Sequence, residues 1–311
     1  LSDMIIDGHY KKCREICEQH GIQFVAEAAG PGPPIHNCPF ESLKSSGVLS
    51  FPRGEFWQQH RNDEMIDLLQ VIKGVASAAH IYDQTFVEAE AFTGTYLWQY
   101  GPGDLKPAAD RAFCEGLNRI IFHTWPHTPE SAGEPGWIYS FGTLMHETRA
   151  WWPLADSWMQ YLGRCSYLLQ QGNFVGDVLY YYGDKAPNFV PAKHMHPELG
   201  FGYDYDVTNR DVLVNRLTVE NGKLTLPHGP SYEILVLPGW DHMNLQVLEK
   251  LETLVKQGAV VMGRKPVTSH GLYDYEPRTK ELRRIADTLW GNTDGETVTR
   301  HAYGEGMIVW G

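Results

Sequence analysis

Strand-like and helix-like segments alternate through the first 172 residues, and this alternation limits the possible folds more than any other feature. The helical segments show apolar residues at intervals of three and four, as an amphipathic helix requires. The strand-like segments are residues 21–27, 46–57, 85–94 and 119–127, and the helical ones are residues 1–21, 61–80, 107–118 and 149–171. Repeated βα units produce parallel strands. We therefore expect residues 1–172 to supply about four βα units, the C-terminal half of a (β/α)8 TIM-type barrel.

A second domain is expected from residue 173 to residue 311, where the pattern changes. Four short segments are almost entirely apolar: "FVGDVLYYYGD", "YEILVLPGW", "GAVVMG" and "GMIVWG". Helical spacing from Leu245 to Val255 separates the second from the third. Short buried strands joined by helices predict a parallel, doubly wound sheet of the flavodoxin type. Asn221-Gly222 predicts the tight turn of a β-hairpin in an insertion.

Acidic residues occupy the strands that should form the interior of the first domain. Glu88 and Glu90 are two residues apart, so on a strand they point to the same face. Glu27 and Glu55 lie at the ends of two other strand-like segments. Because the carboxyl ends of barrel strands form one rim, we expect Glu27, Glu55 and Glu90 to converge there. An ion pair with an Arg or Lys is the alternative for each acid, and we favour it for Glu88.

Histidines and tryptophans accompany these acids in the same segments. They are His80, His123, His127, Trp57 and Trp125. Converging carboxylates suit acid/base hydrolysis or a hard cation such as calcium. For each histidine, a hydrogen-bonded place in the core or at the rim is as good an interpretation as contact with a substrate.

Composition excludes several classes of partner. The net charge of −12 argues against nucleic acid and against an anionic membrane surface. No apolar stretch is long enough to cross a bilayer, so we expect a soluble protein. Five cysteines without a CxxC pair predict neither a disulfide framework nor a zinc site. The 10 Trp and 16 Tyr residues suit a protein that stacks rings against sugars.

Five blocks of the chain resemble, in order, the α-L-rhamnosidases of glycoside hydrolase family 106. They are "PRGEFW", "ASAAHIYDQTFVEAEAFTG", "LKPAADRAFCEGLNRIIFHTWPHTP", "TRAWWPLADSWMQYLGRCSYLLQQGNFVGDVLYYYGD" and "YDYDVTNRDVLVNRLTVENGKLTLPHGPSYEILVLPG". The resemblance implies a catalytic (β/α)8 barrel, inversion at the anomeric carbon, and a calcium ion near the rhamnose hydroxyls. The implied substrate is a plant or microbial glycan or glycoside with terminal rhamnose.

The resemblance also implies roles for individual residues. Glu55 and Glu90 are the expected catalytic residues and calcium ligands, and which of them is the base stays open. Glu27 is a further candidate for either role. We expect contacts to the sugar from the residues Glu27, His80, His123, Trp125, His127 and Trp57.

One motif of the family is missing from the chain. In the family, a strand ending in Asp-Ser-Trp-Glu carries the expected general acid. The only similar residues here, Asp156 to Trp158, lie in a helical segment and precede Met159. We expect a longer protein that supplies the acid, and an inactive enzyme if residues 1–311 stand alone. The compartment stays open, with secretion and the periplasm as alternatives.

The second domain resembles the amidotransferase-like domain that follows the barrel in such glycosidases. An active amidotransferase needs a cysteine nucleophile at a strand-to-helix turn. No cysteine follows Cys165, so we expect a non-catalytic domain. Two other functions remain open for the whole protein: another barrel glycosidase, such as a retaining β-galactosidase, and a carbohydrate-binding protein without catalysis.

Overall fold

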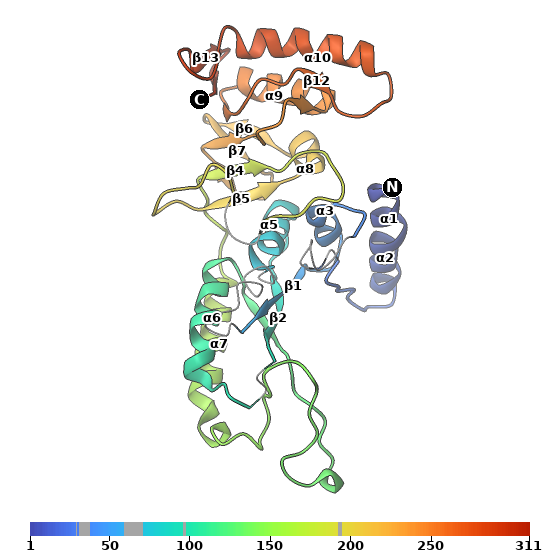
Figure 1. Ribbon diagram of the computed structural model, residues 1–311, viewed down its shortest axis with the longest axis vertical. Helices are drawn as coiled ribbons and strands as arrows, with labels where there is room; N and C mark the ends of the chain where they lie inside the picture. The colour runs from blue at the N-terminus through green and yellow to red at the C-terminus, as the bar shows by residue number, and fades with distance from the viewer. Residues whose placement is uncertain (29, 31–37, 59–70, 96–97, 192–194) are drawn as a thin grey trace. The chain divides into compact units, whose positions relative to one another are not determined.

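The chain divides into two compact units. The computed structural model describes residues 1–28, 30, 38–58, 71–95, 98–191 and 195–311 (Figure 1). The first unit contains Leu1–Ala79, Gln84–Gly172 and Pro191–Lys193, and the second contains His80–Asp83, Asn173–Val190 and His194–Gly311. Much of the helix predicted over residues 61–80 lies outside the described residues. Its end is present as α5, Ile72–Tyr82.

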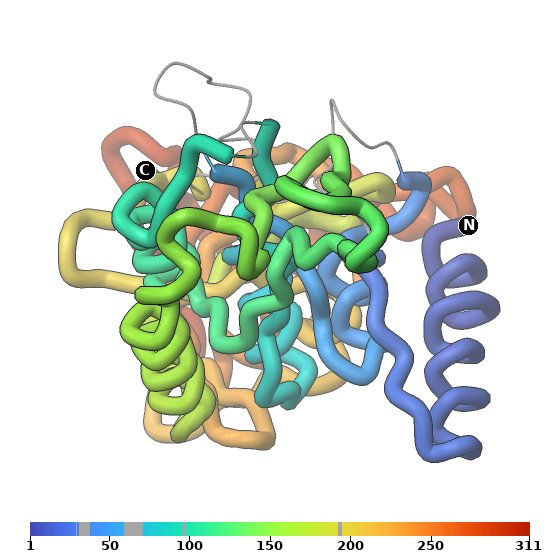
Figure 2. The backbone as a smooth tube through the Cα atoms, turned by 90° about the horizontal axis from the view of Figure 1, so that it is seen from below, coloured from blue at the N-terminus to red at the C-terminus, as the bar shows by residue number. Residues whose placement is uncertain are grey.

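The first unit begins with the predicted helix. It comprises three consecutive parts, α1 (Ser2–Ile5), the π-helical η1 (Ile6–Lys11) and α2 (Lys12–Gln19). Gly21 then takes a left-handed φ of 67°, which glycine adopts without steric cost, and the chain runs back beside the helix (Figure 2). Residues 22–27 were predicted as a strand, but they are extended without joining a ladder. Ser50 binds Phe24 instead, through its backbone and its hydroxyl.

Three parallel strands form the sheet of the first unit. They are β1 (Arg53–Trp57), β2 (Glu88–Thr93) and β3 (Arg119–Phe122), in the spatial order β1-β2-β3. Helix α5 connects β1 to β2, and α6 (Pro102–Cys114) connects β2 to β3. Helix α7 (Ala155–Leu169) follows β3. The short helix α3 (Ser42–Gly47) precedes β1. These elements form repeated βα units, as the alternating pattern predicts.

The helices begin at other residues than expected. Helix α6 starts at Pro102 rather than near Pro107, because the carboxylate of Asp104 in its first turn accepts a hydrogen bond from the Gly101 amide and so holds the start of the helix. Pro107 is tolerated one turn inside the helix. Helix α7 starts at Ala155 rather than Arg149, after the 3-10 turn Trp152–Leu154.

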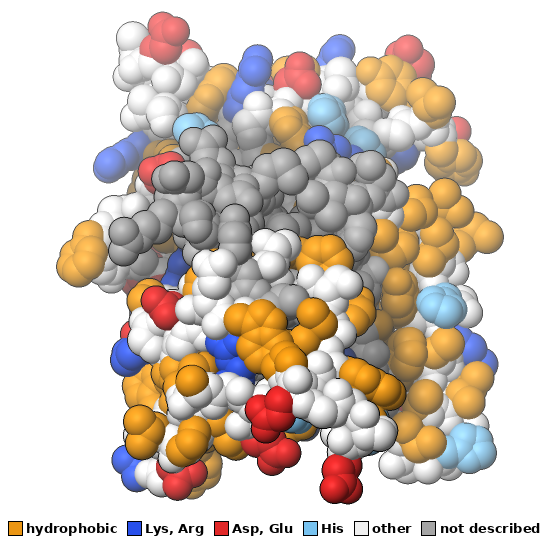
Figure 3. Space-filling view, turned by 60° about the horizontal axis from the view of Figure 1, so that its bottom comes forward, with side chains coloured by type: hydrophobic (Ala, Val, Ile, Leu, Met, Phe, Trp, Pro, Cys, Tyr) orange, Lys and Arg blue, Asp and Glu red, His pale blue; other side chains and the backbone are white. Residues whose placement is uncertain are grey.

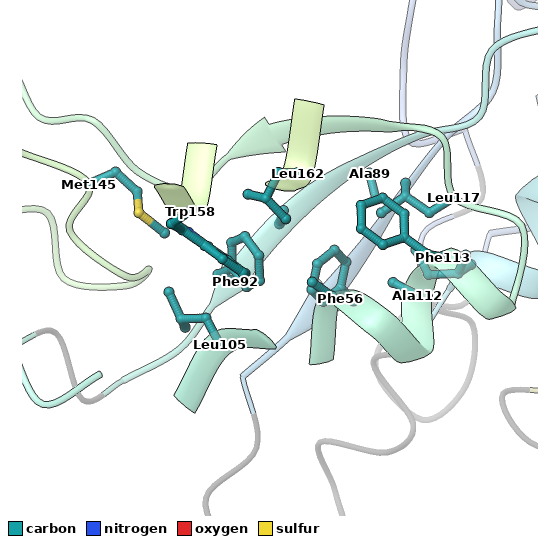
Figure 4. Close-up of a cluster of buried hydrophobic side chains, with 13 residues drawn as sticks. Phe56, Ala89, Phe92, Leu105, Ala112, Phe113, Leu117, Met145, Trp158 and Leu162 are labelled. Atoms are coloured by element: carbon teal, nitrogen blue, oxygen red, sulfur yellow. The ribbon is translucent and has the colours of Figure 1, made fainter. Parts of the chain in front are cut away.

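One face of this sheet is covered by the helices. Phe56, Ala89 and Ala91 point to that face and are fully buried. Figure 4 shows Phe56 and Ala89 packed with side chains of α6 and α7, among them Leu105 and Trp158. Alternation along a strand then sends Glu55 and Glu90 to the opposite face. The apolar core of the unit thus orients the acids away from itself.

The second unit contains a six-stranded sheet. Its spatial order is β13-β14-β11-β9-β4-β5. The four predicted strands are present as β4 (Val178–Tyr181), β9 (Ile234–Val236), β11 (Val260–Met262) and β14 (Gly306–Val309). β5 (Tyr205–Thr208) continues the parallel part, and β13 (Arg300–Tyr303) joins one edge antiparallel. The five parallel strands have the order 2-1-3-4-5, the flavodoxin-like order.

The helices of the second unit differ from the doubly wound prediction. They are α8 (Arg210–Asn215), α9 (Leu245–Lys256) and α10 (Tyr275–Trp290). All three lie in crossovers that advance in the same direction along the sheet, so right-handed connections place them on one face. Helix α9 packs against both of the others. The connection from β4 to β5 runs in the opposite direction, and its described residues contain no helix.

The predicted hairpin is confirmed. Strands β6 (Thr218–Glu220) and β7 (Lys223–Thr225) pair antiparallel, and Asn221 and Gly222 both take positive φ angles. This is the turn type that Asn-Gly favours. Short strands complete the unit: β8 (Ser231–Tyr232) beside β7, and β10 (His242–Met243) beside β12 (Thr268–Ser269). No helix in the described part of the chain combines the length and the apolar character that crossing a membrane requires.

Candidate active site

Glu88 is held by two arginines on neighbouring strands. Its side chain is 1% exposed. Arg53 on β1 lies opposite it in the register, and its Nη2 atom is 2.6 Å from Oε2 of Glu88. The Nε atom of Arg119 on β3 lies 3.0 Å from Oε1. Both carboxylate oxygens are therefore paired, and Glu88 is a structural residue, as we expected for this acid.

Glu55 and Glu90 lie one layer closer to the carboxyl ends of the strands. They are direct partners in the parallel register of β1 and β2. One donor atom from each of Glu55, Glu90 and His123 lies within 4.8 Å of the donor atoms of the other two. All three side chains are partly exposed. The structure therefore brings together three of the predicted site residues at one edge of the sheet.

Gly54, the residue before Glu55, allows the backbone of Val71 to pack closely against β1. A Cβ atom at Gly54 would meet the backbone oxygen of Val71 at 2.2 Å. The amide of Val71 in turn donates to the carbonyl of Glu55. The segment after β1 is thereby fixed against the strand that presents Glu55. This requirement for glycine could have been suspected from "PRGEFW", since glycine in a strand often marks a close approach.

Thr93 and His123 connect the strands at the cluster. His123 Nδ1 lies 3.0 Å from Glu90 Oε1 and 3.0 Å from the hydroxyl of Thr93. The polar groups of Thr93 and Trp57 also lie near enough to Glu55 to hold its pKa down. Thr93 was not among the predicted site residues, although the sequence places it at the end of the strand that carries Glu90. A hydroxyl at a strand end next to predicted acids is the signal that could have identified it.

Burial and neighbouring carboxylates raise the pKa values of Glu55 and Glu27. Burial raises the pKa of Glu55, the Glu90 carboxylate raises it further, and hydrogen bonds from Thr93 and Trp57 oppose the rise. The pKa of Glu27 rises to about 7, first because of desolvation and then because of the Glu55 and Glu90 carboxylates. Arg53 opposes this rise. Glu27 thus belongs to the same electrostatic environment and keeps its proton near neutral pH.

The donor set fits a hard cation through its carboxylates. Calcium takes oxygen ligands, which Glu55 and Glu90 supply. The imidazole of His123 shares a hydrogen bond with the hydroxyl of Thr93 through Nδ1, and the same atom lies 3.0 Å from Oε1 of Glu90. We therefore regard Glu55 and Glu90 as the residues able to hold such an ion, and His123 as a neighbour of Glu90 that Thr93 holds in place.

The predicted aromatic contacts are divided between the cluster and a loop. Trp57 ends β1, and its ring lies 6.2 Å from that of Phe141. Trp125 and His127 are exposed residues of the loop between β3 and α7. Trp125 packs against the rings of His146 and Trp152. His127 packs against Trp137.

His80 has a different environment from the one expected. It lies at the C-terminal end of α5 and belongs to the second unit. Its Nδ1 atom is 2.9 Å from Oδ1 of the fully buried Asp206, and its ring stacks on Phe174 at 4.2 Å. A helix that returns from β1 to β2 ends at the amino edge of the sheet, opposite the edge that carries Glu55. We therefore leave His80 out of the candidate site.

Comparisons with known proteins show the family of the chain. A family described as alpha-L-rhamnosidase, glycoside hydrolase family 106, matches residues 1–311. A relative from Formosa agariphila, named "Putative beta-glucuronidase", is 34% identical over 293 residues, which is 94% of this chain and 24% of that protein. The solved structure of a rhamnosidase from Novosphingobium sp. PP1Y is 28% identical with a TM-score of 0.88, over 100% of this chain and 29% of that one.

A more distant structure shares the fold alone. A GH42 beta-galactosidase from G. stearothermophilus is 12% identical with a TM-score of 0.51, over 86% of this chain and 41% of that one. The chain thus spans about a quarter of the length of the Formosa agariphila and Novosphingobium proteins. Its α/β fold and its sequence nevertheless match along their whole length, and the chain belongs to the alpha-L-rhamnosidase family, glycoside hydrolase family 106.

Proposed function

We propose that the protein containing this chain hydrolyses terminal α-L-rhamnose from glycans or glycosides with inversion at the anomeric carbon. The observation that carries the proposal is the convergence of Glu55, Glu90 and His123 at the carboxyl edge of parallel strands. Ionised carboxylates at such an edge can take a proton from water. Family membership supports rhamnose as the sugar that is released.

In this proposal the first unit is part of a (β/α)8 barrel. Three parallel strands with their helices on one face and acids on the other support that architecture. Glu90 is the favoured general base, because it lies on the central strand β2 with its Oε1 atom 3.0 Å from His123 Nδ1. Glu55 is the alternative base. We place the general acid outside these 311 residues, because inversion needs a second carboxyl about 6.5–9.5 Å from the base.

Calcium is the proposed ion, with Glu55 and Glu90 as its ligands in this chain. When bound, it would hold neighbouring hydroxyls of the sugar. Two carboxylates within 4.8 Å repel each other, and a divalent cation removes that repulsion. Desolvation is the largest cause of the raised pKa values of Glu27 and Glu55, and the neighbouring carboxylates add to it. A bound cation would oppose the part that the carboxylates cause.

The second unit is proposed to be a non-catalytic, amidotransferase-like domain. Its flavodoxin-like strand order supports the resemblance. The turn after β9 reads Leu237-Pro238-Gly239-Trp240-Asp241, and no cysteine follows Cys165 in the chain. The nucleophile that amidotransferase chemistry needs is therefore missing from this turn.

One observation favours a second candidate function. The donor atoms of Glu55 and Glu90 approach within 4.8 Å, which is nearer to the separation of about 5–5.5 Å in retaining glycosidases than to that of inverting ones. In a retaining enzyme, one of the two would be the nucleophile and the other the acid.

Product stereochemistry separates these candidates. The complete enzyme would be mixed with 4-nitrophenyl α-L-rhamnoside, and the first rhamnose released would be followed by proton NMR. Release of β-rhamnose that later mutarotates is the expected result. Initial release of the α-anomer would support the retaining alternative, and no release of rhamnose would contradict both.

A further inference from the structure

The loop between β3 and α7 carries a group of exposed large apolar side chains. Residues 125–141 leave and re-enter the fold at one place, because Thr124 and Thr143 exchange backbone hydrogen bonds with each other and with His123. The re-entering residues Thr143, Leu144 and Met145 are almost fully buried. The base of the loop is thus fixed beside His123, whereas the rest of the loop carries its side chains outward.

Five of these outward side chains are between 44% and 57% exposed: Trp125, Trp137, Ile138, Tyr139 and Phe141. Single exposed apolar residues are ordinary, but a contiguous group of them marks a binding surface. Figure 3 looks onto this side of the unit, where hydrophobic side chains gather and acidic ones lie beside them.

This surface is continuous with the acid cluster. The ring of Tyr139 lies 5.6 Å from that of His123, which contacts Glu90. The ring of Phe141 lies 6.2 Å from that of Trp57, which follows Glu55 by two positions on β1. A sugar cleaved at the acids would therefore have the next part of the substrate beside Tyr139 and Phe141, with Trp137 farther along the loop.

The charges of the loop restrict what it can bind. Residues 123–148 contain Glu130, Glu134 and Glu147 and no Lys or Arg. A uronate or sulfated sugar would meet like charge there without a cation from the loop. Neutral sugar rings instead offer flat apolar faces to aromatic side chains, and burial of such faces is favourable.

We propose that residues 125–141 form the subsite for the leaving-group part of the substrate, and that this subsite takes neutral sugar rings in preference to anionic ones. This inference rests on the proposed function for the identity of the released sugar. Trp137 and Tyr139 are its stacking residues. Neither residue takes part in proton transfer.

The test measures specificity in the complete enzyme. Methyl α-L-rhamnoside is compared with a rhamnosyl-glucose and a rhamnosyl-glucuronate disaccharide for the wild type, Trp137→Ala, Tyr139→Ala and Trp137→Phe. Loss of one stacked ring should weaken the affinity about 2- to 10-fold. We expect each Ala variant to lower kcat/KM for rhamnosyl-glucose, relative to that for the methyl glycoside, by this factor through KM. Trp137→Phe should largely restore the ratio.

Tyr167→Ala is the matched control, because Tyr167 is an equally exposed aromatic residue on α7. It should leave the ratio unchanged. The proposal is overturned if the Ala variants lower kcat/KM equally for all three substrates, or if Tyr167→Ala lowers the ratio as they do. It is also overturned if kcat/KM of the wild type is higher for the glucuronate disaccharide than for rhamnosyl-glucose.

Binding measurements keep this inference separate from the proposed function. The complete Glu90→Gln enzyme is titrated with the two disaccharides and followed by calorimetry. Two results together support the subsite: rhamnosyl-glucose binds more tightly than rhamnosyl-glucuronate, and Trp137→Ala weakens that binding. This holds even if the wild type releases no rhamnose, in which case only the proposed function fails. Equal binding of both disaccharides, or binding indifferent to Trp137, overturns the subsite.

Discussion

The Nδ1 atom of His123 lies 3.0 Å from the Oε1 atom of Glu90, with the hydroxyl of Thr93 at the same distance. Thr93 thus holds the imidazole through Nδ1, beside the carboxylate of Glu90. His123 follows β3, whereas Glu90 and Thr93 lie on β2. The neighbouring strand therefore supplies the imidazole that lies against this acid.

Glu90→Gln should reduce catalysis without unfolding the protein. The amide keeps the size of the side chain but cannot take a proton from water. We expect kcat of the complete enzyme to fall by about 10²–10⁴-fold. Steady-state kinetics with 4-nitrophenyl α-L-rhamnoside would measure the fall. A kcat within threefold of the wild type would contradict the role of Glu90 as base.

Glu88→Gln should lower the stability of the protein rather than its catalysis. The variant leaves Arg53 and Arg119 without their carboxylate, and both arginines are partly exposed, so water can compensate in part. We expect the free energy of unfolding to fall by about 1–3 kcal/mol, less than for a fully buried pair. Denaturant unfolding would measure it. A loss of kcat equal to that of Glu90→Gln, in protein that stays folded, would show that Glu88 also acts chemically.

Stability should depend on pH through Glu27. Its pKa is about 7 in the folded protein against an ordinary value of 4.5. Below pH 4.5 the group is protonated in both states and contributes nothing. Between these values only the unfolded state loses the proton, so folding becomes less favourable as the pH rises, and above pH 7 the penalty is complete.

Glu27→Gln removes this penalty because glutamine does not ionise. In metal-free protein, the variant should unfold at a higher temperature than the wild type at pH 8 and at a similar temperature at pH 4.5. Thermal unfolding followed by circular dichroism would test this. Glu130→Gln, an exposed acid in the loop, is the control and should show no such trend. A Tm difference independent of pH would contradict the raised pKa.

Metal removal should lower activity reversibly. Glu55 and Glu90 offer oxygen ligands, and loss of calcium would leave their charges unbalanced. After exhaustive chelation we expect most rhamnosidase activity to disappear and to return with calcium, but not with magnesium, which demands a stricter geometry. Calorimetric titration should show calcium binding that Glu55→Gln weakens at least tenfold. Full activity in the chelated enzyme would rule out this metal.

Alternation along single strands was enough to predict part of the site. It places Glu88 and Glu90 on one face and Ala89 and Ala91 on the other, as the structure has them. It fails for Phe92, which lies in the apolar core because the backbone takes a positive φ of 65° there. The sequence of the strand alone could not predict that Glu88 is fully paired with arginines whereas Glu90 lies in the acid cluster. This pairing depends on Arg53 and Arg119, which are 35 and 31 positions away and meet Glu88 only through the sheet register.

Other failures have equally local causes. The segment 22–27 has the composition of a strand, but Phe24 finds its partner in Ser50 rather than in a ladder. For His80 the sequence left two interpretations open, and the structure has the hydrogen-bonded one, with Nδ1 2.9 Å from Oδ1 of the buried Asp206. Helix α10 was not predicted, although its buried residues Leu282, Ile285 and Leu289 recur at helical spacing.

The second unit has a consequence for the order in which the protein can be assembled during synthesis. Residues 80–83 belong to it, yet the partner of His80, Asp206, follows 126 residues later. At about 5–20 residues per second, a ribosome needs roughly 6–25 s to make that stretch. During this interval the end of α5 has emerged without the residues that complete its surroundings. A nascent chain paused within this stretch should therefore leave His80 accessible to chemical labelling, and protection should appear only after Asp206 has been translated.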